Sequence, residues 1–406
     1  MKRLAGLILA LFVGVITWLA LASLASAQSI SLLAGGGAQD GVSGLNAVTA
    51  PRQLATDGTN LYVAESNANY VKMLDASGTF HVVAGIGTRR PSGVAIPELA
   101  PATETAANSP NTVAADRFGV TYFTTASTVV KVDGGGAHPI IDTGPFQPDG
   151  LFASLDGAFL YVSDSGNGRV LRYDLMTCAI RCAPPVVLAT GLTFPKGLAV
   201  ATDGTVYVVE NGLNLVKRIS TTGVVSVVAG GGSVLGDGGP AINARFNLPT
   251  QLCIATDGAL IIADTIANRV RRVDLSTGLI STIAGNGTAN SVNNWATPAP
   301  GQSGGTFPIN APIGVACMPS GATIVSTEAD GRLYRVSGGP VPTVTKVATT
   351  AAPALTATRT FASTNTPAPT STRTLPPTMT ATIAPTNTPL PPCQFNKTPI
   401  NLPCAG

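Results

Sequence analysis

Four acidic residues stand at equivalent places along the chain, and arginines follow such places at a fixed distance. The acids are Glu65, Asp164, Glu210 and Asp264, and the arginines, each five residues after such a place, are Arg169, Arg269 and Arg332. Carboxylates beside guanidinium groups could carry out acid–base chemistry or bind a charged substrate. A feature repeated this evenly is more typical of loop structure than of one asymmetric active site. We therefore interpret these side chains as structural, with carboxylates that bind backbone N–H groups and arginine.

Other residue types that commonly carry catalysis are scarce. The chain has two histidines, His81 and His138, and both fall at one position of a sequence repeat in which other copies have serine. Two histidines cannot supply the ligands of a histidine-rich zinc site. No G-x-S-x-G motif occurs, and the Gly-rich segments are not followed by phosphate-binding helices. We expect no catalytic residues and no cofactor, although a calcium ion in a central channel is left open.

The elements that position these side chains form a repeat. The segment from Phe194 to Gly230 reads FPKGLAVATDGTVYVVENGLNLVKRISTTGVVSVVAG, in which four β-rich runs are separated by turns. This pattern is typical of a small antiparallel sheet. Further copies begin at Pro51, Pro110, Pro148, Pro249 and Pro312. Six such units, with insertions between them, predict an all-β, six-bladed β-propeller.

The sixth unit has no clear outer strand of its own. The segment from Ile30 to Gly37, ISLLAGGG, nearly repeats the outer strand VSVVAGGG from Val225, but it precedes the first unit. We predict that this N-terminal strand completes the last blade and closes the ring. The alternative is the segment from Thr343 to Ala348, TVTKVA, which lacks the Ala-Gly-x-Gly ending of the other outer strands.

The units resemble the NHL-repeat family of six-bladed β-propellers over roughly residues 29 to 339. The resemblance rests on GDGGPAINARFNLP from Gly236, on IADTIANRVRRVD from Ile262 and on outer strands that end in AGGG or AGNG. The second unit departs most, with ADRFG from Ala115 and no acid or arginine in its second loop. Some propellers of this type are lyases that hold a metal with several histidines, a ligand set that this chain cannot assemble.

The two ends of the chain differ from the propeller in composition. A basic start, a long apolar run and Ala25-Ser26-Ala27 predict a secretory signal peptide over residues 1–27, or a membrane anchor if it is not cleaved. The propeller is expected over residues 28–340. Residues 341–392 are rich in Thr and Pro, and they predict a disordered stalk, either O-glycosylated or an unmodified linker. Residues 393–406 form a Cys-bounded C-terminal segment.

Export places the six cysteines in an oxidising compartment, where disulfides are the default. Close spacing predicts the pairs Cys178–Cys182 and Cys393–Cys404. The remaining two, Cys253 and Cys317, fall on the innermost strands of adjacent blades, one place out of register. Packed sheets usually lie about 10 Å apart, further than a disulfide spans, so a disulfide and two separate thiols are both left open.

The charge balance limits the partners. Only 11% of the residues are charged, with 24 Lys and Arg against 21 Asp and Glu, and several of the cations lie near the chain ends. A propeller that is close to neutral and has no basic stripe is not expected to bind nucleic acid. We expect membrane contact only through an uncleaved signal anchor, and we expect a monomer.

Long connections between blades predict the ligand face. In a propeller these links lie on the same side as the loops between second and third strands, and long loops on a rigid scaffold commonly carry binding residues. The links contain residues suited to stacking on, or hydrogen bonding to, sugars or peptides, namely Arg89, Arg90, Asn293, Asn294 and Trp295. Alternatively, these links only cap the channel.

The sequence therefore favours a secreted or cell-surface binding module for a protein, peptide or glycan partner. An extracellular propeller enzyme, a lyase or hydrolase with a site at the central channel, is the alternative. A structural protein of the cell envelope, held outward by the stalk, is a further alternative. Propellers host many unrelated functions, so the fold does not decide among these three.

Overall fold

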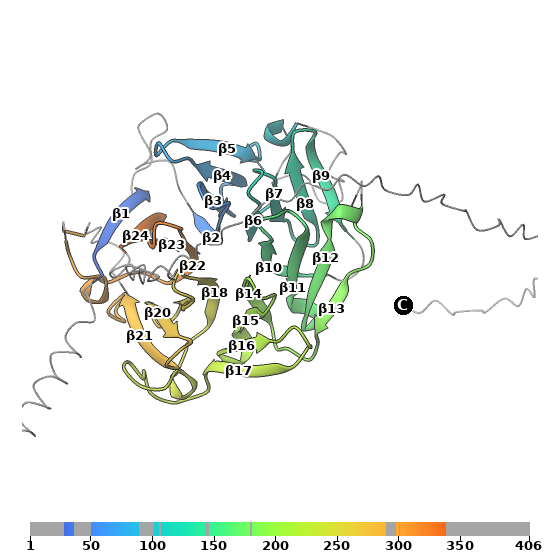
Figure 1. The fold of residues 1–406 in the computed structure, drawn as a ribbon. Helices are drawn as coiled ribbons and strands as arrows, with labels where there is room; N and C mark the ends of the chain where they lie inside the picture. Colours follow the sequence, from blue (N-terminus) through green and yellow to red (C-terminus); the bar gives the residue numbers. More distant parts are fainter. Residues whose placement is uncertain are drawn as a thin grey trace, which may run out of the picture. The chain divides into compact units, whose positions relative to one another are not determined.

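The computed structural model describes residues 28–35, 50–88, 101–104, 107–142, 146–178, 181–289, 298–299 and 301–337. In these residues the chain forms six four-stranded antiparallel sheets, which are arranged around one axis as the blades of a propeller (Figure 1). The prediction of an all-β, six-bladed β-propeller is confirmed. No helix in this part of the chain is long and apolar enough to cross a membrane.

Each blade runs outward from an innermost strand next to the axis. Blades 1 to 3 consist of β2 (Pro51–Thr56), β3 (Leu61–Glu65), β4 (Tyr70–Leu74) and β5 (Phe80–Ala84); β6 (Val113–Ala115), β7 (Thr121–Thr124), β8 (Val129–Asp133) and β9 (Gly136–Ile141); and β10 (Pro148–Ala153), β11 (Phe159–Asp164), β12 (Arg169–Asp174) and β13 (Val186–Ala189). Blades 4 to 6 consist of β14 (Pro195–Val200), β15 (Val206–Glu210), β16 (Leu215–Ile219) and β17 (Val225–Gly230); β18 (Pro249–Ile254), β19 (Leu260–Asp264), β20 (Arg269–Asp274) and β21 (Leu279–Ala284); and β22 (Pro312–Cys317), β23 (Thr323–Thr327), β24 (Arg332–Val336) and β1 (Ile30–Gly35).

Tight turns join the first and second strands of each blade. In blade 1, Gly58 adopts a φ of 98°, a conformation that favours glycine. The carboxylate of Asp57 accepts hydrogen bonds from the N–H groups of Thr59 and Asn60, both at 2.7 Å. An aspartate that binds its own turn in this way stabilises the reversal.

The N-terminal strand β1 closes the ring, as predicted. It pairs antiparallel with β24, with Ile30 opposite Val336 and Ser31 opposite Arg335. Figure 1 shows β1 on the outer side of β24, as the fourth strand of blade 6. The alternative segment, residues 343–348, lies outside the described residues, and β1 holds the position that it would have taken.

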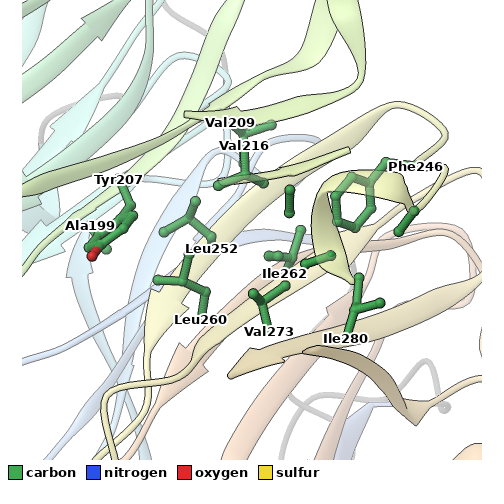
Figure 2. Close-up of a cluster of buried hydrophobic side chains, with 13 residues drawn as sticks. Ala199, Tyr207, Val209, Val216, Phe246, Leu252, Leu260, Ile262, Val273 and Ile280 are labelled. Atoms are coloured by element: carbon green, nitrogen blue, oxygen red, sulfur yellow. The ribbon is translucent and has the colours of Figure 1, made fainter. Parts of the chain in front are cut away.

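The core consists of apolar layers between neighbouring blades. Between blades 4 and 5, Val209 and Val216 belong to the same buried cluster as Leu252 and Ile262 (Figure 2). Phe246, from the connection between these blades, completes the layer and is 2% exposed. Because each blade buries side chains on both faces, its second strand is buried at nearly every position.

Two disulfides are formed in the described residues. Cys178 pairs with Cys182 as predicted, and Cys253 pairs with Cys317, which settles the choice that the sequence left open. The spacing of about 10 Å applies to sheets that pack face to face. Propeller blades converge at the axis, and there the Cα atoms of Cys253 and Cys317 are 5.8 Å apart.

Four predicted features lie outside the described residues. They are the signal peptide (1–27), the stalk (341–392), the C-terminal segment (393–406) and the pair Cys393–Cys404.

The closing strand allows a matched test of ring closure. Ala34 is fully buried between blades 6 and 1, whereas Ser31 on the same strand is exposed. We expect Ala34→Asp to lower the Tm by roughly 5 °C or more, because an unpaired charge becomes buried. Ser31→Asp is the control and should leave the Tm nearly unchanged. Equal Tm values for the two variants would contradict a stabilising role of β1.

Candidate functional site

The carboxylates that end the second strands bind the connections leading into their own blades. Glu65, Asp164, Glu210 and Asp264 are fully buried, and those of blades 3, 4 and 5 accept a hydrogen bond from a backbone N–H that lies just before the innermost strand. The pairs, with their N···O distances, are Gln147–Asp164 (3.1 Å), Thr193–Glu210 (2.8 Å) and Asn247–Asp264 (2.7 Å). This bond fixes the point at which the chain enters a blade.

The cation that pairs with the carboxylate stands at one of two spacings. Arg169 does bind Asp164, at 2.8 Å. In blades 1 and 4 the partner lies seven residues after the acid, in the pairs Glu65–Lys72 (2.8 Å) and Glu210–Lys217 (2.7 Å). Lys72 stands opposite Val63, two places from Glu65, so both side chains lie on one face of the sheet.

Two of the predicted arginines make other contacts. Arg269 donates hydrogen bonds to the carbonyl oxygens of Ala267 (3.2 Å) and Asn286 (2.8 Å). Arg332 is 2% exposed and lies 3.4 Å from the Tyr334 hydroxyl. The sequence therefore also contains a seven-residue spacing of acid and cation, in the pairs Glu65–Lys72 and Glu210–Lys217.

Blade 5 shares one buried arginine between two acids. Arg271 Nη1 lies 3.7 Å from Asp264 Oδ2, further than the ion pairs of the other blades. Its Nη2 atom binds Asp237 Oδ1 at 2.7 Å and the Leu235 carbonyl at 2.8 Å, both in the link between blades 4 and 5. Burial raises the pKa of Asp264 to about 6, against the lowering effects of the Asn247 N–H and the arginines nearby.

Asparagines bind the link that enters the following blade. Asn69, Asn214 and Asn268 have φ values of 56°, 57° and 51°, in the left-handed region that asparagine tolerates. Their side-chain oxygens accept from the N–H of the residue that precedes the next innermost strand. The pairs are Asn69–Ser109 (3.0 Å), Asn214–Leu248 (2.7 Å) and Asn268–Ala311 (2.9 Å). The end of each link that enters the next blade is therefore held by a buried or half-buried asparagine of the preceding blade.

Two glutamines close the central channel. The Oε1 atom of Gln251 accepts from the N–H groups of Leu54 (3.1 Å) and Val315 (3.0 Å), and its Nε2 donates to the Leu54 carbonyl (2.6 Å). Gln53 Nε2 donates to the Asp149 carbonyl at 2.7 Å. These bonds run from blade 5 to blade 1 and from blade 1 to blade 3, so each side chain crosses the axis. The repeat did not reveal this role.

Glycines at the same strand position leave room for the glutamines. A Cβ atom on Gly197 would lie 2.6 Å from the Cα of Gln251, and one on Gly314 would lie 3.0 Å from its Oε1. Both positions therefore favour glycine, because Gln251 approaches their backbone too closely for a side chain. The third residue of the innermost strand is glycine in some blades and glutamine in others. The packing of side chains at the axis explains this alternation.

A charged cluster lies at the end of the channel near the inter-blade links. Arg52 forms a bidentate pair with Glu328, with distances of 2.9 and 3.0 Å, and donates to Asn111 Oδ1 at 3.0 Å. These three residues belong to blades 1, 6 and 2. The cluster connects the first and last blades across the seam of the ring.

The histidines lie on outer strands, as the sequence placed them. His81 on β5 binds Asp75 at 2.8 Å, and His138 on β9 binds Asp133 at 3.1 Å. Among the described residues, no three His, Cys, Asp or Glu side chains are grouped so that they could hold a metal ion.

Four large apolar side chains are exposed on the face of the propeller that carries the inter-blade links, and together they form what we call the apolar patch. We use this name for Phe194, Leu213, Leu248 and Ile266, which are 58%, 52%, 44% and 51% exposed. They are neighbours through the backbone, because Asn211 N donates to the Phe194 carbonyl and Leu248 N to the Asn214 side chain. The N–H of Ile266 donates to the Asn247 carbonyl, next to Leu248. Phe194 and Leu248 have φ values of 50° and 49°, which are unusual for large side chains.

The predicted ligand residues Arg89, Arg90, Asn293, Asn294 and Trp295 lie outside the described residues. The links that contain them leave blades 1 and 5 after β5 and β21, and they enter blades 2 and 6 at the same face as the apolar patch. The structure thus describes the ends of these links and not the side chains in question.

No protein-family model matches the chain. Over 278 residues the chain is 22% identical to teneurin-1 of Mus musculus, an alignment that covers 53% of this chain and 10% of teneurin-1. Over 155 residues it is 26% identical to the chloroplastic protein SUPPRESSOR OF QUENCHING 1 of Arabidopsis thaliana, covering 32% of this chain and 14% of that protein. The chain therefore matches a minor part of the length of each of these relatives.

Solved structures share the propeller fold. A Bacteroides thetaiotaomicron protein of unknown function is 16% identical, with a TM-score of 0.57 over 77% of this chain and 76% of that chain. An auxiliary nutrient binding protein from the same organism is 14% identical, with a TM-score of 0.57 over 76% of each chain. A gluconolactonase from Xanthomonas campestris is 16% identical, with a TM-score of 0.50 over 78% and 92%. At these identities the likeness shows the fold alone.

We expect Gln251→Ala to destabilise the propeller. The substitution leaves two buried N–H groups and one carbonyl without their partner, which should lower the free energy of unfolding by roughly 2 to 4 kcal/mol. The control is Gln302→Ala, because Gln302 Oε1 accepts a hydrogen bond from the Ala299 N–H in an exposed position. Denaturant unfolding measures both variants. A loss for Gln251→Ala no larger than for the control would refute the bridging role.

The pKa of Asp264 predicts a pH dependence of stability. Because this pKa is raised from 3.8 to about 6 in the folded state, the folded protein binds more protons than the unfolded chain between these values. The contribution of Asp264 to the free energy of unfolding is therefore fully present below about pH 4 and is lost as the pH rises through about 6. Asp264→Asn removes the titration. Lowering the pH from 7 to 5 should then raise the Tm of the wild type relative to that variant.

A second carboxylate provides the control for this pH effect. Hydrogen bonds, with that of the Ser276 side chain the strongest, lower the pKa of Asp274, so its titration lies below this pH range. The Tm difference between wild type and Asp274→Asn should be the same at pH 5 and pH 7. If Asp264→Asn behaves in the same way, the raised pKa of Asp264 is wrong.

Proposed function

We propose that this protein is a secreted or cell-surface propeller of the NHL type that binds a protein or peptide partner through the face of its inter-blade links. The observation that carries this proposal is the apolar patch. Contiguous exposed apolar side chains on a folded protein commonly mark an interaction site. The large side chains of Phe194 and Leu248 stand in strained backbone conformations, which are also frequent at functional sites.

The buried polar groups support the patch from beneath. Glu210 binds the N–H of Thr193, next to Phe194, and Asp264 binds the N–H of Asn247, next to Leu248. The patch side chains are therefore presented from backbone that is already fixed. A preorganised surface loses little conformational entropy on binding, which increases affinity.

Other observations agree with a binding role outside the cytoplasm. One of the propellers with the same fold is described as a nutrient binding protein, and the chain shares a segment with teneurin-1. Two disulfides in the described residues favour an oxidising compartment. The links with Arg89, Arg90, Asn293, Asn294 and Trp295 extend this proposed face and could add glycan or peptide contacts. We propose a monomer that does not bind nucleic acid.

The binding role can be tested with a random peptide library and a glycan array, both probed with the full-length secreted protein. We expect peptides with apolar side chains to be enriched. The double variant Leu213→Asp and Ile266→Asp should bind these peptides at least about tenfold more weakly, because charges replace apolar contacts. Val82→Asp is the control, since Val82 is 43% exposed on the outer strand β5, away from the patch.

Three outcomes would contradict parts of this proposal. Peptides that bind the double variant as well as the wild type would place their site elsewhere. If the protein bound only glycans, and the double variant bound them equally well, the partner would be a glycan rather than a peptide. An absence of any enriched peptide or glycan would refute the binding role.

A further inference from the structure

A cavity of about 210 Å³ lies on the axis, on the side of Gln251 away from the inter-blade links. Its walls are the last residues of all six innermost strands, from residues 54–56 of β2 to residues 315–317 of β22. It extends from Gln251, which is 6% exposed, to Leu155, which is 51% exposed in the turn after β10. The cavity is therefore a cup with an amide floor and a mouth at the turns between first and second strands. We call it the axial cup.

The walls of the axial cup are apolar. Apart from Thr56 and Gln251, every residue that lines it is Leu, Ala, Phe, Val, Ile or half-cystine. Side chains of this kind favour the entry of apolar molecules, and the polar groups of the lining are mainly backbone atoms of the innermost strands. This composition differs from the opposite end of the channel, where Arg52 and Glu328 form their ion pair.

The floor adds directed hydrogen-bonding groups. Gln251 binds both the N–H and the carbonyl of Leu54, so the backbone at this strand position points to the axis. Leu151 and Leu198 pair with the second strands of their blades in the same register as Leu54. Their backbone groups therefore also face the axis, since alternate residues of an edge strand direct their N–H and C=O groups away from the neighbouring strand.

The disulfide and the charged groups at the mouth define the site further. Cys253 and Cys317 line the wall and cross-link the innermost strands of blades 5 and 6, which keeps the cup open in one shape. At the mouth, Asp57 is engaged by the amides of its own turn, and Asp257 by Arg272 at 2.6 Å. Both carboxylates already have hydrogen-bonding partners, which favours a neutral ligand.

We infer that the axial cup binds a small, neutral and mainly apolar molecule of about ten non-hydrogen atoms with one hydrogen-bonding group. An apolar cavity of about 150 Å³ holds benzene, so the larger cup suits a two-ring molecule of the size of indole. The apolar rings contact the walls, and the polar group reaches the backbone at the floor. This site lies on the opposite face from the apolar patch and is independent of the proposed function.

Calorimetric titration of the full-length secreted protein with indole tests the inference. The expected Kd lies between about 10 µM and 1 mM, as is usual for a ligand of this size. Val200 lines the cup and is half-buried, so Val200→Trp fills the space and should weaken binding at least about tenfold. Val187→Trp is the control, because Val187 is 49% exposed on the outer strand β13. The Tm of each variant shows whether it is folded.

A mapping experiment covers the case in which Val200→Trp does not fold. A photoreactive indole with a diazirine group, irradiated with the wild-type protein, should label peptides that contain residues 151–155, 198–200 or 252–254. Labels confined to other segments, or no saturable heat up to about 2 mM indole, would overturn the inference. The double variant of the apolar patch should bind indole normally, so failure of one proposal is distinguishable from failure of the other.

Discussion

The structure depends on the unpaired inner edge of each blade. The innermost strand has a hydrogen-bonded neighbour on one side only, and its other backbone groups face an axis with little access to water. Buried backbone groups without partners are costly. Side chains from the preceding blade satisfy several of these carbonyls. The donor–acceptor pairs are Ser163–Lys196, Asn211–Pro249 (2.7 Å), Thr250–Ile313 (2.6 Å) and Ser326–Arg52.

This requirement explains why the ring must close. Each blade supplies donors to the next, and Ser326 of blade 6 supplies the edge of blade 1, so blade 6 must be held in place beside blade 1. The strand β1 completes blade 6 from outside, while Gln251 and Gln53 cross the axis from inside. Both faces of the propeller are therefore rigid. The links on one face start from fixed backbone, and the axial cup on the other has walls that belong to all six blades.

The features of the fold that recur in every blade could be predicted from the sequence. Strand positions, the number of blades and the closing strand followed from recurring patterns, such as ISLLAGGG before the first unit. The Cys253–Cys317 pairing did not follow, because the distance between two innermost strands depends on how far the blades converge. The Gln251 bridge was also hidden, because it connects blades that are not adjacent and depends on glycines at Gly197 and Gly314. In blade 5 the five-residue spacing did not reveal the ion pair of Asp264 with Arg271, although the charge of Arg269 also lowers the pKa of Asp264.

Residues that depart from the repeat are therefore the ones to examine for function. The repeated acids, asparagines and serines bind backbone within and between blades. By contrast, the place before each innermost strand holds Ala50, Ser109, Gln147 and Ala311 in four blades, but Phe194 and Leu248 in blades 4 and 5. Neither large side chain is needed for the entry, because Ser109 and Ala311 adopt similar positive φ values of 44° and 39°. Phe194 and Leu248 are 58% and 44% exposed, so at these two entries apolar surface that a small residue would not present is open to contact with another molecule.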